Sequence, residues 1–118
     1  MVVRFDYQGK RVLFTGDAER ETDESILAWG ERLRSDLLKV SHHGSRTSST
    51  PSFVRGVDPG IAIVSVGAFN KFGHPAAEVM GLYRQRGTRV YRTDRCGAVV
   101  VTVAGGGYSV ETVIDDGC

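Results

Sequence analysis

Short apolar runs alternate with helical patterns through the middle of this 118-residue chain, and the alternation leaves few folds open. Runs rich in β-branched residues predict strands, and amphipathic stretches that begin with acidic residues or proline predict helices. We expect strands at residues 2–7, 11–15, 36–41, 60–67 and 88–93, and two more joined by a Gly-rich turn within 97–114. We expect helices at residues 17–33, 51–57 and 75–87.

This order of elements predicts an α/β fold with a mixed β-sheet. The first two strands flank a "QGK" turn and form a hairpin. The later strands alternate with helices, which indicates parallel pairing beneath covering helices. A chain that is 41% hydrophobic and 25% charged has enough apolar residues to fold. It begins directly on the strand-like "VVRFDY", which we interpret as a cut through a longer protein.

The formal net charge of +1 points to no particular partner, because an obligate nucleic-acid binder is usually more basic. The two cysteines, Cys96 and Cys118, lack the spacing of a zinc site. We expect two unpaired thiols, with a disulfide between them as the alternative. The sequence contains no apolar run long enough to cross a bilayer and no signal-peptide pattern.

Ionisable groups follow three of the expected strands. Asp17 comes after the strand at 11–15, His42 and His43 follow the next strand, and His74 follows the strand at 60–67. The carboxyl ends of strands form the usual functional edge of an α/β sheet. If the three strands are neighbours, these side chains converge on one edge.

Each of these residues also has a purely structural interpretation. Asp17 could cap the following helix, and the histidine pair could bond to backbone carbonyls. Taken together, a carboxylate and imidazoles are ligands for a divalent metal that activates water. The Gly, Ser and Thr residues after His43 could leave room for an anionic substrate and donate hydrogen bonds to it. Serine-nucleophile catalysis is the weaker alternative, because no Gly-x-Ser-x-Gly elbow is present.

Four segments carry a family resemblance. The stretches "LFTGDAE", "LLKVSHHGSRTSS", "SVGAFNKFGHP" and "TDRCGAVVVTV" resemble, in this order, the C-terminal half of the metallo-β-lactamase-like domain of ComEC-type DNA-internalisation (competence) proteins. The resemblance implies that residues 1–118 form half of an αββα sandwich, with a mixed β-sheet and helices on one side. The family's first metal motif, HxHxDH or HxDxDH, is absent from this chain and belongs to the N-terminal half.

The resemblance also implies roles for individual residues. Asp17 and His42 match metal ligands, while His43 and His74 match positions of catalytic or substrate-contacting side chains. His74 would act as a proton donor or phosphate contact. Further substrate contacts are expected from Ser45, Arg46, Thr47 and Asn70. Cys96 is a departure, since a polar or acidic residue is expected there.

By the same resemblance, the complete domain is a metal-dependent hydrolase that cleaves phosphodiester bonds of DNA during uptake. It would hold two zinc or manganese ions. This chain alone would bind none tightly, because a catalytic zinc site normally needs three protein ligands. The implied partners are the missing N-terminal half, a membrane channel domain of the parent protein, and single-stranded DNA. The chain would be a soluble segment of a bacterial inner-membrane protein, on a side of the membrane that the sequence does not indicate.

Two alternatives stay open at this point. The chain could be a non-catalytic DNA- or partner-binding module with a degenerate metal site, contacting single-stranded DNA through Arg46, Phe69 and Lys71. It could also belong to a small-molecule metallo-hydrolase, because one fold hosts many chemistries. In each case we expect half of a sandwich to expose apolar sheet surface and to self-associate.

Overall fold

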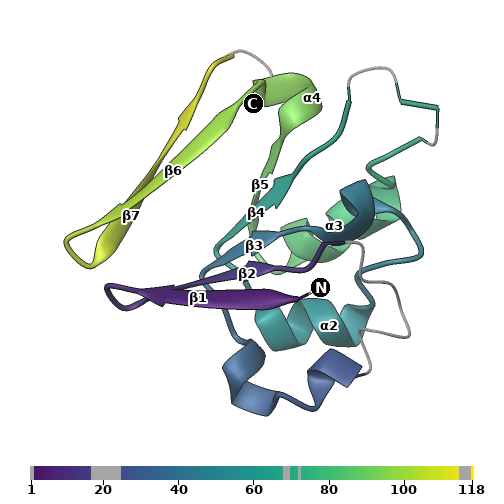
Figure 1. The fold of residues 1–118 in the computed structure, drawn as a ribbon. Coiled ribbons are helices and arrows are strands. Elements are labelled where there is room, and N and C mark those ends of the chain that lie inside the picture. The colour runs from purple at the N-terminus through teal and green to yellow at the C-terminus, as the bar shows by residue number, and fades with distance from the viewer. Residues whose placement is uncertain (1, 17–24, 68–69, 72, 115–117) are drawn as a thin grey trace.

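The computed structural model describes residues 2–16, 25–67, 70, 71, 73–114 and 118, and it contains two β-sheets (Figure 1). One sheet has five strands in the order β1-β2-β3-β4-β5, and the other is the hairpin of β6 and β7. The strands are β1 (Val3–Tyr7), β2 (Lys10–Phe14), β3 (Leu37–Lys39), β4 (Ile61–Val64), β5 (Arg89–Arg92), β6 (Val99–Ala104) and β7 (Gly107–Thr112). All seven strands expected from the sequence are present, and the mixed α/β fold is confirmed.

The five-stranded sheet is mostly parallel. Strand β1 pairs antiparallel with β2, whereas β2, β3, β4 and β5 pair in parallel. In this register Leu13 lies opposite Leu38, Leu38 opposite Ala62, and Ala62 opposite Val90. Leu13, Leu38 and Ala62 are fully buried, so this row marks the face of the sheet that the helices cover.

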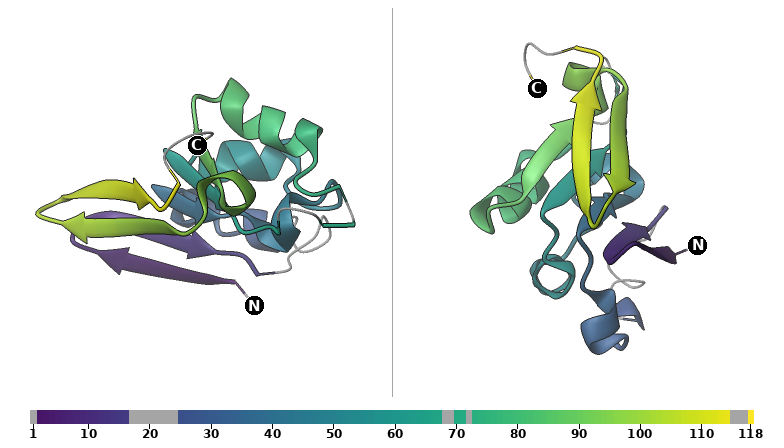
Figure 2. Two further views of the ribbon diagram at one scale, coloured as in Figure 1. Left: turned by 90° about the horizontal axis from the view of Figure 1, so that it is seen from above. Right: turned by 90° about the vertical axis from the view of Figure 1, so that its left-hand side faces the viewer.

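Helices α2 (Pro51–Val57) and α3 (Ala77–Gln85) pack on one face of the five-stranded sheet (Figure 2). Helix α2 begins as expected, because the Thr50 hydroxyl accepts a hydrogen bond from the Phe53 amide at 3.2 Å. Two further turns were not predicted: η2 (Ser41–Gly44) and α4 (Thr93–Cys96). Each has four residues, which is too short for a periodic pattern to reveal.

A single hydrophobic core lies between the sheet and the two helices. The strands contribute Leu13, Leu38, Ala62 and Val64, and the helices contribute Phe53, Val54, Val57, Val79, Met80 and Tyr83. The loop at the carboxyl edge of β3 has exposed residues, among them His43, Arg46 and Thr47. That edge is where the sequence analysis placed the candidate site.

The helix expected at residues 17–33 is only partly tested, because 17–24 lie outside the described residues. Residues 25–27 are helical, but a separate 3-10 turn, η1 (Gly30–Leu33), follows. Gly30 has a left-handed backbone with φ of +61°. A residue in that conformation cannot continue a right-handed helix, so the expectation of an unbroken helix to residue 33 is wrong.

The β6–β7 hairpin returns the chain to α4, where Cys118 forms a disulfide with the buried Cys96. The expectation of unpaired thiols is therefore wrong. The amide of Ile114 donates to the Cys96 carbonyl at 2.8 Å, which brings the end of the chain back to α4. The two cysteine Cα atoms are 5.0 Å apart, within the range that a disulfide spans. Among the described helices, none has the length and apolar character needed to cross a membrane.

Candidate functional site

Three histidines meet at the carboxyl edge of the parallel strands. His42 and His43 directly follow β3 through Val40 and Ser41, and His74 lies in the segment between β4 and α3. The ring centroids of His42 and His74 are 5.9 Å apart, and those of His42 and His43 are 6.4 Å apart. The expected convergence of the histidine loops is confirmed.

The loop after β2 reaches the same place. The amide of His42 donates to the carbonyl of Gly16 at 2.9 Å. Asp17, the expected metal ligand, is the next residue along the chain and lies outside the described residues. Its role as a ligand therefore stays a prediction, although the residue before it touches the histidine loop.

The backbone of the histidine loop is left-handed over three consecutive residues. His42, His43 and Gly44 have φ angles of +48°, +54° and +77°. Such angles are uncommon for residues other than glycine, and they cluster at functional sites. The amide of Ser45 donates to the His42 carbonyl at 2.9 Å and closes this tight turn.

His43 is oriented by a backbone carbonyl. Its Nδ1 lies 2.6 Å from the carbonyl oxygen of Ser65, the residue directly after β4. A carbonyl can only accept, so Nδ1 carries the proton and donates it. In the neutral imidazole this leaves the Nε2 lone pair to accept a proton or to bind a metal, the arrangement typical of a positioned histidine.

Asn70 holds the segment that carries His74. Its side-chain amide donates to the carbonyls of His74 at 2.8 Å and of Gly67 at 3.0 Å, while its Oδ1 accepts from the His74 amide at 2.9 Å. The structure thus gives Asn70 a role in shaping the loop. The expected contact between Asn70 and substrate stays a prediction.

The pKa of the His74 imidazole is lowered from its ordinary value. Burial has the largest effect, and the neighbouring His42 and His43 lower the pKa further by charge repulsion. The neutral ring is therefore favoured at neutral pH. A neutral imidazole can accept a proton or use its lone pair as a ligand, and it still offers one N–H to a phosphate oxygen.

The hydroxyl-rich loop after Gly44 divides into a buried and an exposed part. Ser45 is 5% exposed, and its Oγ lies 2.9 Å from Thr47 Oγ1 and accepts from the Thr47 amide at 3.2 Å. Arg46 and Thr47 are exposed, and Arg46 Nε lies 3.6 Å from Glu78 Oε1. Arg46 and Thr47 are thus better placed than Ser45 to reach a ligand, and all three substrate contacts stay predictions.

Sequence reasoning missed two contacts that shape this edge. The Thr93 hydroxyl accepts from the Val66 amide at 2.8 Å and donates to the Val66 carbonyl at 3.0 Å, which ties the end of β5 to the loop after β4. Thr93 ends an expected strand at this edge, so its position could have drawn attention. The Ser65 carbonyl that orients His43 has no sequence signal, because every residue has one.

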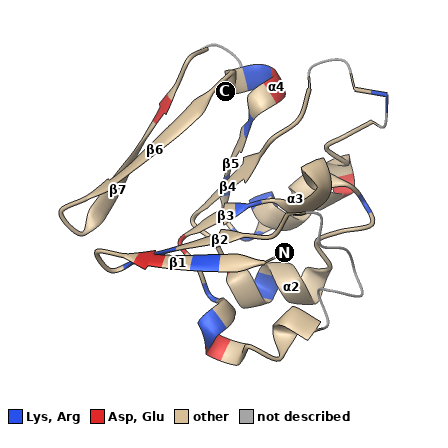
Figure 3. Ribbon diagram, in the orientation of Figure 1, with Lys and Arg blue, Asp and Glu red and all other residues tan. Residues whose placement is uncertain are grey.

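Imidazole nitrogens are suitable donors for zinc or manganese, so the chemistry of the described edge fits such an ion. Within the described ranges, however, no three His, Cys, Asp or Glu side chains lie close enough together to hold a metal ion. The described side chains thus do not form a complete ligand set, and the role of His42 as a ligand stays a prediction. Basic and acidic residues are interspersed over the described strands, helices and loops (Figure 3), consistent with the small net charge.

No protein-family model matches this chain. It is 33% identical to ComE operon protein 3 of Bacillus subtilis over 99 residues, and this matched stretch is 84% of this chain and 13% of that protein. It is 35% identical to competence protein ComA of Neisseria gonorrhoeae over 111 residues, a stretch that is 93% of this chain and 16% of that protein. It is 33% identical to recombination protein 2 of Haemophilus influenzae over 100 residues, a stretch that is 85% of this chain and 12% of that protein. The chain thus spans less than a fifth of the length of these relatives.

Proposed function

Because this chain is related to a segment of competence proteins, we propose that it serves DNA uptake as the C-terminal half of a metallo-β-lactamase-like domain that hydrolyses DNA phosphodiester bonds. The observation that carries the proposal is the meeting of His42, His43 and His74 at one edge of a parallel sheet. The TGD and HHGS segments, which contain Asp17 and the histidine pair, are the residues of the family resemblance.

The residues of this chain would have different roles in the reaction. Asp17 and His42 would hold the metal together with ligands from the N-terminal half of the domain. When bound there, zinc or manganese would supply Lewis acidity and lower the pKa of a coordinated water. His43, held through Ser65, would keep its Nε2 directed at the site, and His74 would contact the phosphate or move a proton.

Phosphate binding would come from the exposed part of the hydroxyl-rich loop. Arg46 pairs with Glu78 at 3.6 Å, and the two side chains are 76% and 68% exposed. An ion pair this exposed contributes little stability, so Arg46 can leave Glu78 for a phosphate oxygen at small cost. In the parent protein, this domain would act beside a membrane channel on the DNA that passes through.

The test is hydrolysis of single-stranded DNA by the longer protein, containing this chain and the residues before it in the parent. We expect cleavage that requires zinc or manganese. Asp17→Ala and His42→Ala should each lower the rate at least about 100-fold, because loss of a ligand should cost no less than loss of its supporting contacts. Metal binding measured by calorimetry should weaken in parallel. Gln85→Ala, an exposed change on α3, is the control and should leave both unchanged.

Other results would select the alternatives. DNA binding without metal-dependent cleavage would indicate a binding module. Cleavage of cyclic nucleotides or lactones, but not of DNA, would indicate a small-molecule hydrolase. If Asp17→Ala and His42→Ala leave cleavage and metal affinity unchanged, the assigned ligands are wrong.

A further inference from the structure

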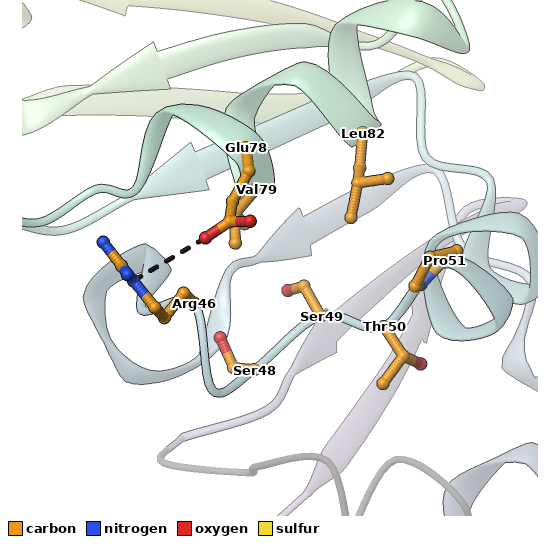
Figure 4. A pocket seen from close by; sticks show the side chains of 8 residues that line it. All are labelled: Arg46, Ser48, Ser49, Thr50, Pro51, Glu78, Val79 and Leu82. Atoms are coloured by element: carbon orange, nitrogen blue, oxygen red, sulfur yellow. Dashed lines mark ion pairs between the residues drawn. The ribbon is translucent and has the colours of Figure 1, made fainter.

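A pocket of about 400 Å³ opens between the hydroxyl-rich loop and helix α3 (Figure 4). The loop wall is formed by Arg46, Ser48, Ser49, Thr50 and Pro51. The helix wall is formed by Glu78, Val79 and Leu82, within the first two turns of α3. This volume lies in the range of pockets that bind small molecules.

Both walls continue directly from the histidine loops. Arg46 follows His42 by four residues, and Glu78 follows His74 by four residues. The two segments are joined at their start, where the Ala76 amide donates to the Gly44 carbonyl at 2.9 Å. Along the chain, both walls of the pocket therefore lie only a few residues from the histidines.

The loop wall is rigid, because its hydroxyls already bond to the protein. Ser48 Oγ donates to the Ser45 carbonyl at 2.8 Å, and the buried Ser49 Oγ lies 2.8 Å from the hydroxyl of Tyr83. Thr50 Oγ1 accepts from the first turn of α2. The pocket is thus formed before a ligand arrives, which avoids an ordering cost on binding.

The lining of the pocket combines apolar and charged side chains. Val79, Leu82 and Pro51 line it with apolar groups, while Arg46 and Glu78 form an exposed ion pair at 3.6 Å (Figure 4). A flat uncharged ring attached to a phosphate suits this lining, with the ring against Val79, Leu82 and Pro51 and the phosphate near Arg46.

We propose that this pocket is a subsite for one unpaired nucleobase of single-stranded DNA, next to the phosphodiester held at the histidines. The inference rests on the proposed function for its phosphate position. A base inside a duplex could enter only after extrusion from the stack, so the subsite favours single strands. Burying one base face against apolar side chains is tolerant of sequence, so the preference for any of the four bases should be small.

The experiment compares two ligands that differ only in their bases. The full chain is titrated, in EDTA to prevent cleavage, with fluorescently labelled single-stranded (dT)₃ and with the same backbone carrying three abasic sites. We expect roughly fivefold weaker binding of the abasic trimer, the scale of burying about 40 Å² of base surface against apolar side chains. Leu82→Trp, which fills the pocket, should weaken (dT)₃ to the level of the abasic trimer. Gln85→Trp, exposed on the same helix and outside this pocket, should leave the difference unchanged.

Equal affinity of the wild-type chain for the two trimers overturns the subsite, even if the longer protein cleaves DNA. Absence of binding to either trimer overturns it as well. Conversely, a base-dependent affinity that Leu82→Trp removes supports the subsite even if metal-dependent cleavage is never found, so the two proposals can fail separately. The comparison of ligands uses the unaltered protein, and thermal unfolding of both Trp variants checks that they fold.

Discussion

At the scale of single residues, Gly44 fixes the geometry of the histidine loop. Its φ of +77° is left-handed, and a Cβ built on it would lie 2.6 Å from Pro75 Cβ. Pro75 follows His74, so the close approach of Gly44 sets how near the two histidine loops come. Any larger residue must push these loops apart.

We therefore predict that Gly44→Ala lowers the free energy of unfolding by about 3 kcal/mol, from left-handed strain and overpacking together. Urea denaturation measures the loss. The matched control is Gly67→Ala on the loop after β4, where an added Cβ meets nothing within 4 Å and φ is ordinary. It should change stability by less than about 0.5 kcal/mol. Equal effects of the two changes would show that the contact with Pro75 does not restrain the loop.

At the scale of elements, Gly56 in α2 and Gly81 in α3 allow the effect of helix propensity on stability to be measured apart from the effect of packing. Gly81 lies in the middle of α3, and an added Cβ there meets nothing within 4 Å. Gly81→Ala should raise the free energy of unfolding by about 0.5–1 kcal/mol, because alanine favours the helical backbone. Gly56 in α2 is the comparison, since its Cβ would lie 3.0 Å from Leu33 Cδ2. A larger gain at Gly56 than at Gly81, by thermal unfolding, would contradict this reasoning.

The turn after β5 contains a carboxylate whose charge stabilises the fold. Arg92 donates to both Asp94 oxygens, at 3.0 and 2.6 Å. These bonds lower the pKa of Asp94 below its ordinary value of 3.8, helped by the charges of Arg92 and Arg95 and opposed by burial. The folded pKa is the lower one. The contribution is therefore complete above the ordinary pKa and is lost as pH falls through the folded pKa.

Asp94→Asn should accordingly lower the free energy of unfolding at pH 7 by about 2 kcal/mol, the scale of hydrogen bonds to a charged group. The difference from wild type should shrink as pH falls below 3.8. Asp6 offers a matched control, because it pairs with Arg4 at the same spacing at 2.9 Å but is 54% exposed. Asp6→Asn should cost about 0.5 kcal/mol or less. A constant difference for Asp94→Asn down to strongly acidic pH would rule out the ionic contribution.

The sequence predicted the strands and helices better than the conformations of the loops and the disulfide that connect them. β-Branched runs such as 60–67 mark strands whatever surrounds them, and parallel neighbours bring His42 and His74 to one edge as expected. The left-handed run at residues 42–44 could not be predicted, because contacts with Gly16 and Pro75, distant in sequence, fix it. The disulfide was only the alternative expectation for the same reason, because the β6–β7 hairpin decides where Cys118 lies.

At the scale of the whole molecule, the disulfide attaches a separate sheet. It closes a span of 22 residues that contains the β6–β7 hairpin. The hairpin also contacts the first hairpin of the main sheet: the Gly105 amide donates to Gln8 Oε1 at 2.9 Å, and Lys10 lies over the Tyr108 ring. Reduction with dithiothreitol should lower the free energy of unfolding by about 3 kcal/mol. Hydrogen exchange should accelerate in β6 and β7 while β3 and β4 stay protected. Uniform acceleration would mean that the hairpin and the main sheet unfold together.

The face of the five-stranded sheet turned away from the helices determines how the chain behaves alone. Parallel sheets are usually covered on both faces. Here the residues on that face include Phe5, Tyr7 and Phe14, which are 58%, 57% and 44% exposed, and the rings of Phe5 and Phe14 pack edge to face. Register places Phe5 opposite Val12 and Val3 opposite Phe14, which extends the apolar surface across β1 and β2.

We therefore predict that the 118-residue chain self-associates through this face at high concentration. Size-exclusion chromatography with light scattering should show a mass that rises with concentration. Changing Phe5 and Phe14 together to threonine keeps the strand propensity of both positions. The double change should weaken association at least about tenfold, because burying each ring in an interface contributes about 2 kcal/mol. The control changes Val100 and Val113, exposed on and after β6–β7, to threonine. A constant monomer mass, or an equal effect of both pairs, would mean that this face is not the one that associates.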